Sequence, residues 1–144
     1  HIPMEDRIIT LEDVRELKVP HENWVGLIFS NARGEARDGK SVNALLNSVL
    51  RMRPDRIILG EIRKENAFTF CSAINTGHRG SMATVHANDA KAALEAVINR
   101  VMLNGDIAES SLEVMRRQLH SDIDGVIQLQ RETDGVHAVF EALK

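Results

Sequence analysis

Arg56-Ile57-Ile58-Leu59-Gly60-Glu61 is the most strand-like run of the chain. Its continuous apolar stretch is typical of a strand that is covered on both faces, as in a parallel sheet. Apolar residues at helical spacing precede it at 42–50, and a second helix is expected to follow it at 65–76. Strands that alternate with helices predict an α/β fold with a mostly parallel sheet.

The same alternation continues on both sides of this run. Further strands are expected at 7–11, 24–30 and 81–85, and a hairpin at 126–130 and 136–140 around Asp134-Gly135. Ser41 and Asn88 are expected to cap the starts of two helices, and Gly77 the end of another. The helix after Asn88 has an apolar face formed by Ala93, Leu94, Val97, Ile98, Val101 and Met102, and a further helix is marked by Leu112, Met115 and Leu119.

The composition of the 144 residues, with 43% apolar and 27% charged residues, is that of one soluble globular domain. A net charge of −3 argues against a dedicated nucleic-acid binder. The single cysteine, Cys71, excludes a disulfide framework and favours a reducing compartment, and neither a membrane span nor a signal peptide is expected. The chain starts with His1, which favours a piece cut from a longer protein, although Met4 would also serve as an initiator behind a short tag.

Glu61 ends the apolar strand, and in open α/β sheets ligands lie beyond the carboxyl ends of the strands. A buried strand that ends in an acid can hold hydrated magnesium or polarise an attacking water. Taken alone, such a run more often ends in a merely solvated glutamate. Glu12-Asp13 follows another strand, so two strands offer acids at the same edge.

Arginines flank this segment, and their donor forks suit phosphate oxygens: Arg51, Arg53, Arg56 and Arg63. The alternative is pairing with surface acids, which we expect for Arg56 because it lies inside the strand. His78 and His86 flank the strand at 81–85, but no cysteine or acid completes a zinc site with them. They are expected either to make polar contacts in a phosphate or subunit-interface site or to be structural.

Three ordered motifs resemble those of the type II/type IV secretion and pilus-assembly ATPases. Residues 9–17 (ITLEDVREL) resemble the aspartate box, residues 50–63 (LRMRPDRIILGEIR) the Walker B segment, and residues 75–81 (NTGHRGS) with 83–88 (ATVHAN) the histidine box. The absence of a CxxC pair departs from the zinc-bearing type II subgroup. Pro20-His21-Glu22-Asn23 and the LRMRPD run favour the type IV secretion, conjugation and tight-adherence branches.

The resemblance implies a RecA-like P-loop ATPase core that uses ATP and Mg²⁺. It implies that Glu12 is the catalytic glutamate and that Glu61 is the Walker B acid, which acts on magnesium through water. It also implies contacts to phosphates or a neighbouring subunit for Arg51, Arg53 and Arg63, and places near the nucleotide for His78 and His86. The implied assembly is a hexameric ring that docks on an inner-membrane secretion or pilus platform protein at the cytoplasmic face, without direct nucleic-acid binding.

A possible phosphate loop lies at 34–41 (GEARDGKS), where Gly34, Gly39, Lys40 and Ser41 fit the G-x-x-x-x-G-K-[ST] pattern. Its two internal carboxylates would repel a polyphosphate. In the resembling family the phosphate loop lies upstream of the aspartate box, where this chain has only residues 1–8. We therefore expect 34–41 to be a decoy and 1–144 to be a partial domain, truncated at its N-terminus, that binds ATP feebly.

Two alternatives remain open at the level of sequence. One is an inactive assembly or docking domain with the same fold. The other is a complete small NTPase that uses Lys40.

Overall fold

The computed structural model describes residues 2–29, 42–104 and 109–143. The chain divides into two compact units, His1–Thr84 and Val85–Lys144. No helix of the described part is both long enough and apolar enough to cross a bilayer.

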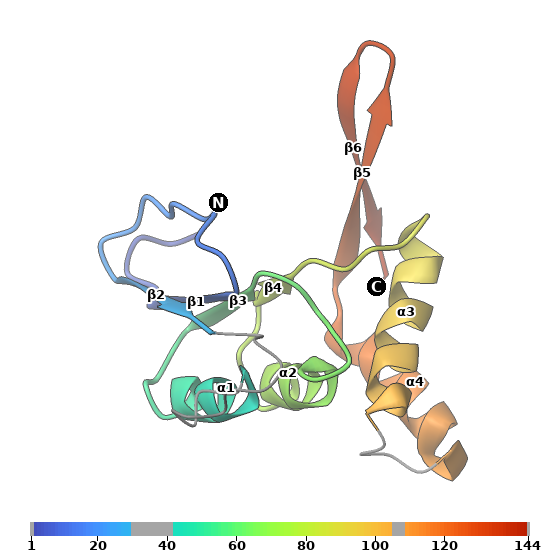
Figure 1. Ribbon diagram of the computed structural model, residues 1–144, viewed down its shortest axis with the longest axis horizontal. Coiled ribbons are helices and arrows are strands. Elements are labelled where there is room, and N and C mark those ends of the chain that lie inside the picture. Colours follow the sequence, from blue (N-terminus) through green and yellow to red (C-terminus); the bar gives the residue numbers. More distant parts are fainter. Residues whose placement is uncertain (1, 30–41, 105–108, 144) are drawn as a thin grey trace. The chain divides into compact units, whose positions relative to one another are not determined.

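The first unit contains a four-stranded parallel sheet in the order β2-β1-β3-β4 (Figure 1). Its strands are β1 (Ile8–Glu12), β2 (Trp24–Ile28), β3 (Arg56–Leu59) and β4 (Met82–Ala83). The predicted strand at 81–85 is thus only two residues long. The mostly parallel sheet that the sequence predicts is present.

The central position of β1 explains its burial. Leu11 pairs with Leu27 of β2 and with Leu59 of β3, so β1 has a hydrogen-bonded neighbour on each side. All five residues of β1 are buried, including Thr10, whose hydroxyl accepts a 3.1 Å hydrogen bond from the Trp24 indole. In β3 only Ile57 and Leu59 are fully buried. The strand that is buried along its whole length is therefore β1.

Helices α1 (Val42–Leu50) and α2 (Ala67–Asn75) contact each other on one face of this sheet (Figure 1). Both expected helices are therefore present. Gly77 was expected to cap the end of α2; the C-cap is Thr76, and Gly77 follows it with a φ of 107°, a left-handed conformation that costs glycine little. The buried side chains of the two helices are Val42, Leu46 and Val49 in α1, and Ala67, Phe70, Cys71 and Ala73 in α2.

The second unit begins with α3 (Ala90–Leu103), which buries the predicted apolar face except for Met102, a partly exposed residue. Asn88 was expected to cap this helix, and that prediction is wrong. Asp89 is the N-cap, and its carboxylate accepts a 2.7 Å hydrogen bond from the Ala92 amide. A 3-10 turn, η1 (Glu109–Ser111), leads into α4 (Leu112–Asp122), which packs on α3.

The unit ends with the expected antiparallel hairpin, β5 (Gly125–Glu132) and β6 (Gly135–Ala142) (Figure 1). Cross-strand partners such as Ile127 and Phe140 share one face of the hairpin. Both side chains are about two-thirds exposed, at 64% and 66%. The hairpin therefore presents an apolar face to solvent within its own unit.

Candidate active site

The carboxyl ends of β1 and β3 lie side by side, because Leu11 and Leu59 are partners in the parallel register. Glu12 is the last residue of β1, and Glu61 follows β3 by two positions. The edge is continuous beyond the strands, since the Gly60 amide donates a 2.8 Å hydrogen bond to the Leu11 carbonyl. The structure therefore brings both predicted acidic segments to the edge where open α/β sheets bind ligands.

Arg63 joins the two acidic segments. Its Nε donates to Glu61 Oε2 at 2.7 Å, and its Nη2 donates to Asp13 Oδ2 at 2.9 Å. The hydrogen bond with Glu61 is the main cause that raises the pKa of Arg63 above its ordinary value, with burial opposing it. Because the shift is upward, the guanidinium stays charged throughout the physiological pH range.

Glu12 has a different environment. Its side chain is only 4% exposed, and Oε1 accepts hydrogen bonds from the amides of Glu16 and Leu17 at 2.9 and 2.8 Å. Charge-assisted bonds of this kind are stronger than neutral ones. The carboxylate of Glu12 thus holds the turn that follows β1 and is itself fixed in orientation.

The backbone that carries Glu61 is fixed from two sides. On one side, the Thr84 hydroxyl donates to the Gly60 carbonyl, and the Ile62 amide donates to the Thr84 carbonyl at 2.9 Å. On the other side, Asn66 donates from Nδ2 to the Glu61 carbonyl at 3.0 Å. Its Oδ1 accepts from the Arg63 amide at 2.9 Å.

Sequence reasoning did not select Asp13, Asn66 or Thr84 as site residues. Asp13 was visible as the neighbour of Glu12 at a strand end, and Thr84 lies inside the histidine-box match. Asn66 carried no site signal, because it lies inside the helix that the sequence analysis expects at 65–76.

Arg51 and Arg53 precede β3 and therefore lie at the amino edge of the sheet, opposite Glu61. Their turn is tied to the start of β1 by a 3.0 Å hydrogen bond from Arg7 Nε to the Met52 carbonyl. Both arginines are exposed, and neither forms an ion pair within the described part of the chain. Arg53 has a φ of 53°, a conformation that costs a non-glycine residue about 1–2 kcal/mol.

Arg56 forms the ion pair with an acid that the sequence analysis expected. Its Nε lies 2.6 Å from Asp6 Oδ2, and its side chain is 24% exposed. Arg56 therefore secures the segment before β1 rather than the acidic edge.

The two histidines belong to different units. His78 follows α2, and its Nδ1 lies 3.1 Å from the Ala73 carbonyl, so it secures the end of that helix. His86 lies in the second unit, between β4 and α3. The predicted decoy loop, with Gly34, Gly39, Lys40 and Ser41, lies outside the described residues.

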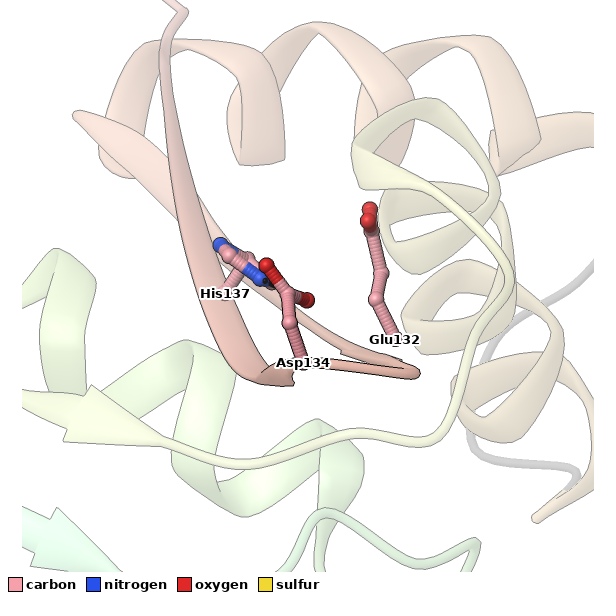
Figure 2. A group of neighbouring side chains, drawn as sticks. All are labelled: Glu132, Asp134 and His137. Carbon is pink, nitrogen blue, oxygen red and sulfur yellow. Dashed lines mark hydrogen bonds and ion pairs between the residues drawn. The ribbon is translucent and has the colours of Figure 1, made fainter.

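A separate cluster of possible metal ligands surrounds the hairpin turn: Glu132, Asp134 and His137 (Figure 2). One ligand atom of each lies within 4.8 Å of the others. His137 Nε2 already lies 2.8 Å from Asp134 Oδ1, and all three residues are exposed. Exposed groups of this kind commonly occur without a metal, so the cluster supports no assigned site.

Known proteins resemble this chain over most of its length. The family model described as "Type II/IV secretion system protein" matches residues 1–137. The type IV secretion system protein VirB11 of Bartonella henselae is 42% identical over 130 residues, which are 90% of this chain and 36% of that protein. The conjugal transfer protein TrbB of Rhizobium radiobacter is 37% identical over 131 residues, which are 91% of this chain and 36% of that protein.

Solved structures share the fold. The VirB11 ATPase of the Brucella suis type IV secretion system, in complex with sulphate, aligns with a TM-score of 0.79 and 30% identity, covering 98% of this chain and 42% of that one. The pilus retraction motor PilT with bound ADP aligns with a TM-score of 0.61 over 92% of this chain and 37% of that one, and at 22% identity it supports the fold alone. The expected RecA-like α/β fold is confirmed, and the chain spans about two fifths of these proteins.

Proposed function

This chain belongs to the type II/IV secretion system protein family, and from that premise we propose that it carries the water- and magnesium-handling part of an ATPase. The full-length protein would hydrolyse ATP to power protein or DNA secretion or pilus assembly. The observation that carries the proposal is the edge where Glu61 and Asp13 share Arg63 beside the end of β1. Residues 1–144 would form a partial RecA-like ATPase domain whose phosphate loop lies elsewhere.

The donor set at this edge fits magnesium. Mg²⁺ prefers hard oxygen ligands and is held by one or two carboxylates together with phosphates and water. Glu61 and Asp13 offer such oxygens at partly exposed positions, 26% and 37%. When bound, the ion would neutralise charge on the phosphates of ATP.

Each residue of the edge would have a separate task. Glu61 would hold magnesium through a bound water, and Glu12 would orient the attacking water with a carboxylate that is already fixed by two backbone amides. Arg63 would exchange a carboxylate partner for a phosphate oxygen, because guanidinium binds both groups in the same planar manner.

We propose the remaining residues as contacts outside this edge. Arg51 and Arg53, at the opposite edge of the sheet, would meet a neighbouring subunit of a hexameric ring. His78 and His86 would approach the nucleotide once the ring is complete. The ring would dock on an inner-membrane platform protein at the cytoplasmic face, without direct nucleic-acid contact.

Replacing Glu61 by glutamine in the full-length protein tests this proposal. We expect Glu61→Gln to lower ATP turnover by about a hundredfold or more, as is usual for loss of a group that handles a reacting water or its proton. The thermal midpoint should stay close to that of the wild type, because the amide has nearly the same shape. Phosphate release and thermal unfolding measure the two quantities.

Glu65→Gln is the matched control, since the Glu65 side chain is 55% exposed and, among the described residues, its ion pair is a long one, 3.8 Å to Lys64. It should leave turnover unchanged. Normal turnover in Glu61→Gln would refute the role of Glu61. If the wild-type protein with intact fold does not hydrolyse ATP, the inactive docking domain becomes the better description.

A further inference from the structure

Asn66 occupies the N-cap position of α2 without capping the helix. Its backbone is helical, with φ −115° and ψ −11°, and its side chain makes no capping hydrogen bond. Asparagine is among the residues that most favour N-caps, where its side-chain oxygen accepts from the helix amides. Here the side chain turns back toward the preceding loop.

The Asn66 amide joins the two ends of the loop that carries Glu61. Its NH₂ group donates to the Glu61 carbonyl at 3.0 Å, and its oxygen accepts from the Arg63 amide at 2.9 Å. The side chain is 1% exposed, so no solvent replaces either bond. One bond needs a donor and the other needs an acceptor, and the asparagine amide supplies both from two separate atoms.

The two bonded residues are the ones that form the charged part of the edge. Glu61 and Arg63 face each other through a 2.7 Å ion pair, and Arg63 continues to Asp13. Both side-chain hydrogen bonds of Asn66 go to the backbone from which the Glu61 and Arg63 side chains project. A shift of this backbone would displace both groups at once.

We propose that Asn66 is a positioning residue, which sets the place of the Glu61 carboxylate for magnesium through hydrogen bonds to the Glu61 carbonyl and the Arg63 amide. This inference rests on the proposed ATPase function. It assigns Asn66 an effect on magnesium dependence and turnover that a helix cap would not have.

Asn66→Ala in the full-length protein removes both bonds. We expect turnover to fall about tenfold and the Mg²⁺ concentration for half-maximal turnover to rise about tenfold, since each buried partner left unpaired costs free energy of this order. Circular dichroism at the assay temperature ensures that only folded protein is compared. Loss of folded protein alone would lower the maximal rate without moving the Mg²⁺ midpoint.

Asn66→Asp removes only one of the two bonds, because a carboxylate accepts from the Arg63 amide but has no donor for the Glu61 carbonyl. The Mg²⁺ concentration for half-maximal turnover should therefore rise in this variant too, which a merely structural role would not cause. Asn99→Asp makes the same change at an exposed position of α3 and should leave the Mg²⁺ midpoint unchanged.

The results distinguish a failure of the role proposed for Asn66 from a failure of the proposed ATPase function. Wild-type turnover and an unchanged Mg²⁺ midpoint in Asn66→Ala, or an unchanged Mg²⁺ midpoint in Asn66→Asp, would overturn the role of Asn66 while leaving the ATPase intact. Absence of ATP turnover in the wild type would overturn both. If Asn66→Ala does not fold, the Mg²⁺ midpoint of Asn66→Asp decides alone.

Discussion

Among single residues, Glu12 has one task that the structure shows and one that we propose. Its Oε1 accepts two backbone amides in a buried setting, which is a structural task. The family resemblance assigns it a task in handling water. The first can be measured as stability and the second as turnover, so one substitution that keeps an acceptor oxygen distinguishes them.

Glu12→Gln should lower the free energy of unfolding by only about 1 kcal/mol, because the amide oxygen still accepts from Glu16 and Leu17, although more weakly. Turnover in the full-length protein should fall about a hundredfold. Urea unfolding and phosphate release measure these effects.

Glu16→Gln serves as the control, because only the backbone of exposed Glu16 takes part in this turn. It should change neither quantity. A destabilised Glu12→Gln protein with wild-type turnover would show that Glu12 is structural only.

The site was predictable where it depends on strand ends. Glu12 and Glu61 were found because a strand that ends in an acid places it at the sheet edge. By sequence alone, Arg63 and Arg53 were equally good candidates for phosphate contacts. They lie at opposite ends of β3, which is about 13 Å long at about 3.3 Å per residue. Asn66 could not be found, because its role depends on α2 beginning at Ala67, and apolar spacing alone placed Asn66 inside the helix expected at 65–76.

At the scale of elements, the start of α3 offers two neighbouring polar residues for one cap. Asp89→Ala should lower the free energy of unfolding by about 1 kcal/mol, because the Ala92 amide loses its acceptor. Chemical denaturation measures this difference.

Asn88→Ala is the matched control and should be nearly neutral. A larger loss of stability in Asn88→Ala than in Asp89→Ala would show that Asn88 is the cap of α3 and that Asp89 is not.

The predicted helices and strands are present because each depends on the local spacing of apolar residues. Their ends differ from the predicted ends where side-chain hydrogen bonds determine where an element begins. Helix α2 begins at Ala67 rather than at 65, since residues 64–66 form the turn that Asn66 stabilises. The hairpin was predicted from Asp134-Gly135, and Gly135 has a φ of 150° there. The pairing of β1 with β3 and the complete burial of β1 depend on contacts between residues far apart in the sequence. The spacing of apolar residues along the chain therefore did not predict them.

At the scale of the whole molecule, the sequence leaves open whether the 144 residues bind nucleotide by themselves. Calorimetry with ATP and Mg²⁺ should detect no binding by this chain or by Lys40→Ala, because Glu35 and Asp38 would repel a polyphosphate in that loop. Lys18→Ala, at another exposed lysine, is the control. Binding that only Lys40→Ala abolishes would establish 34–41 as a working phosphate loop.

The central place of β1 has a consequence during synthesis. The ribosome makes β1 before both of its neighbours, and its partner Leu59 is added long after Leu11. At about 5–20 residues per second, roughly 2–9 s pass before β3 exists to pair with β1. Until then the edge of β1 that faces β3 has no hydrogen-bonding neighbour, so the sheet cannot close around its most buried strand before about 60 residues have been made.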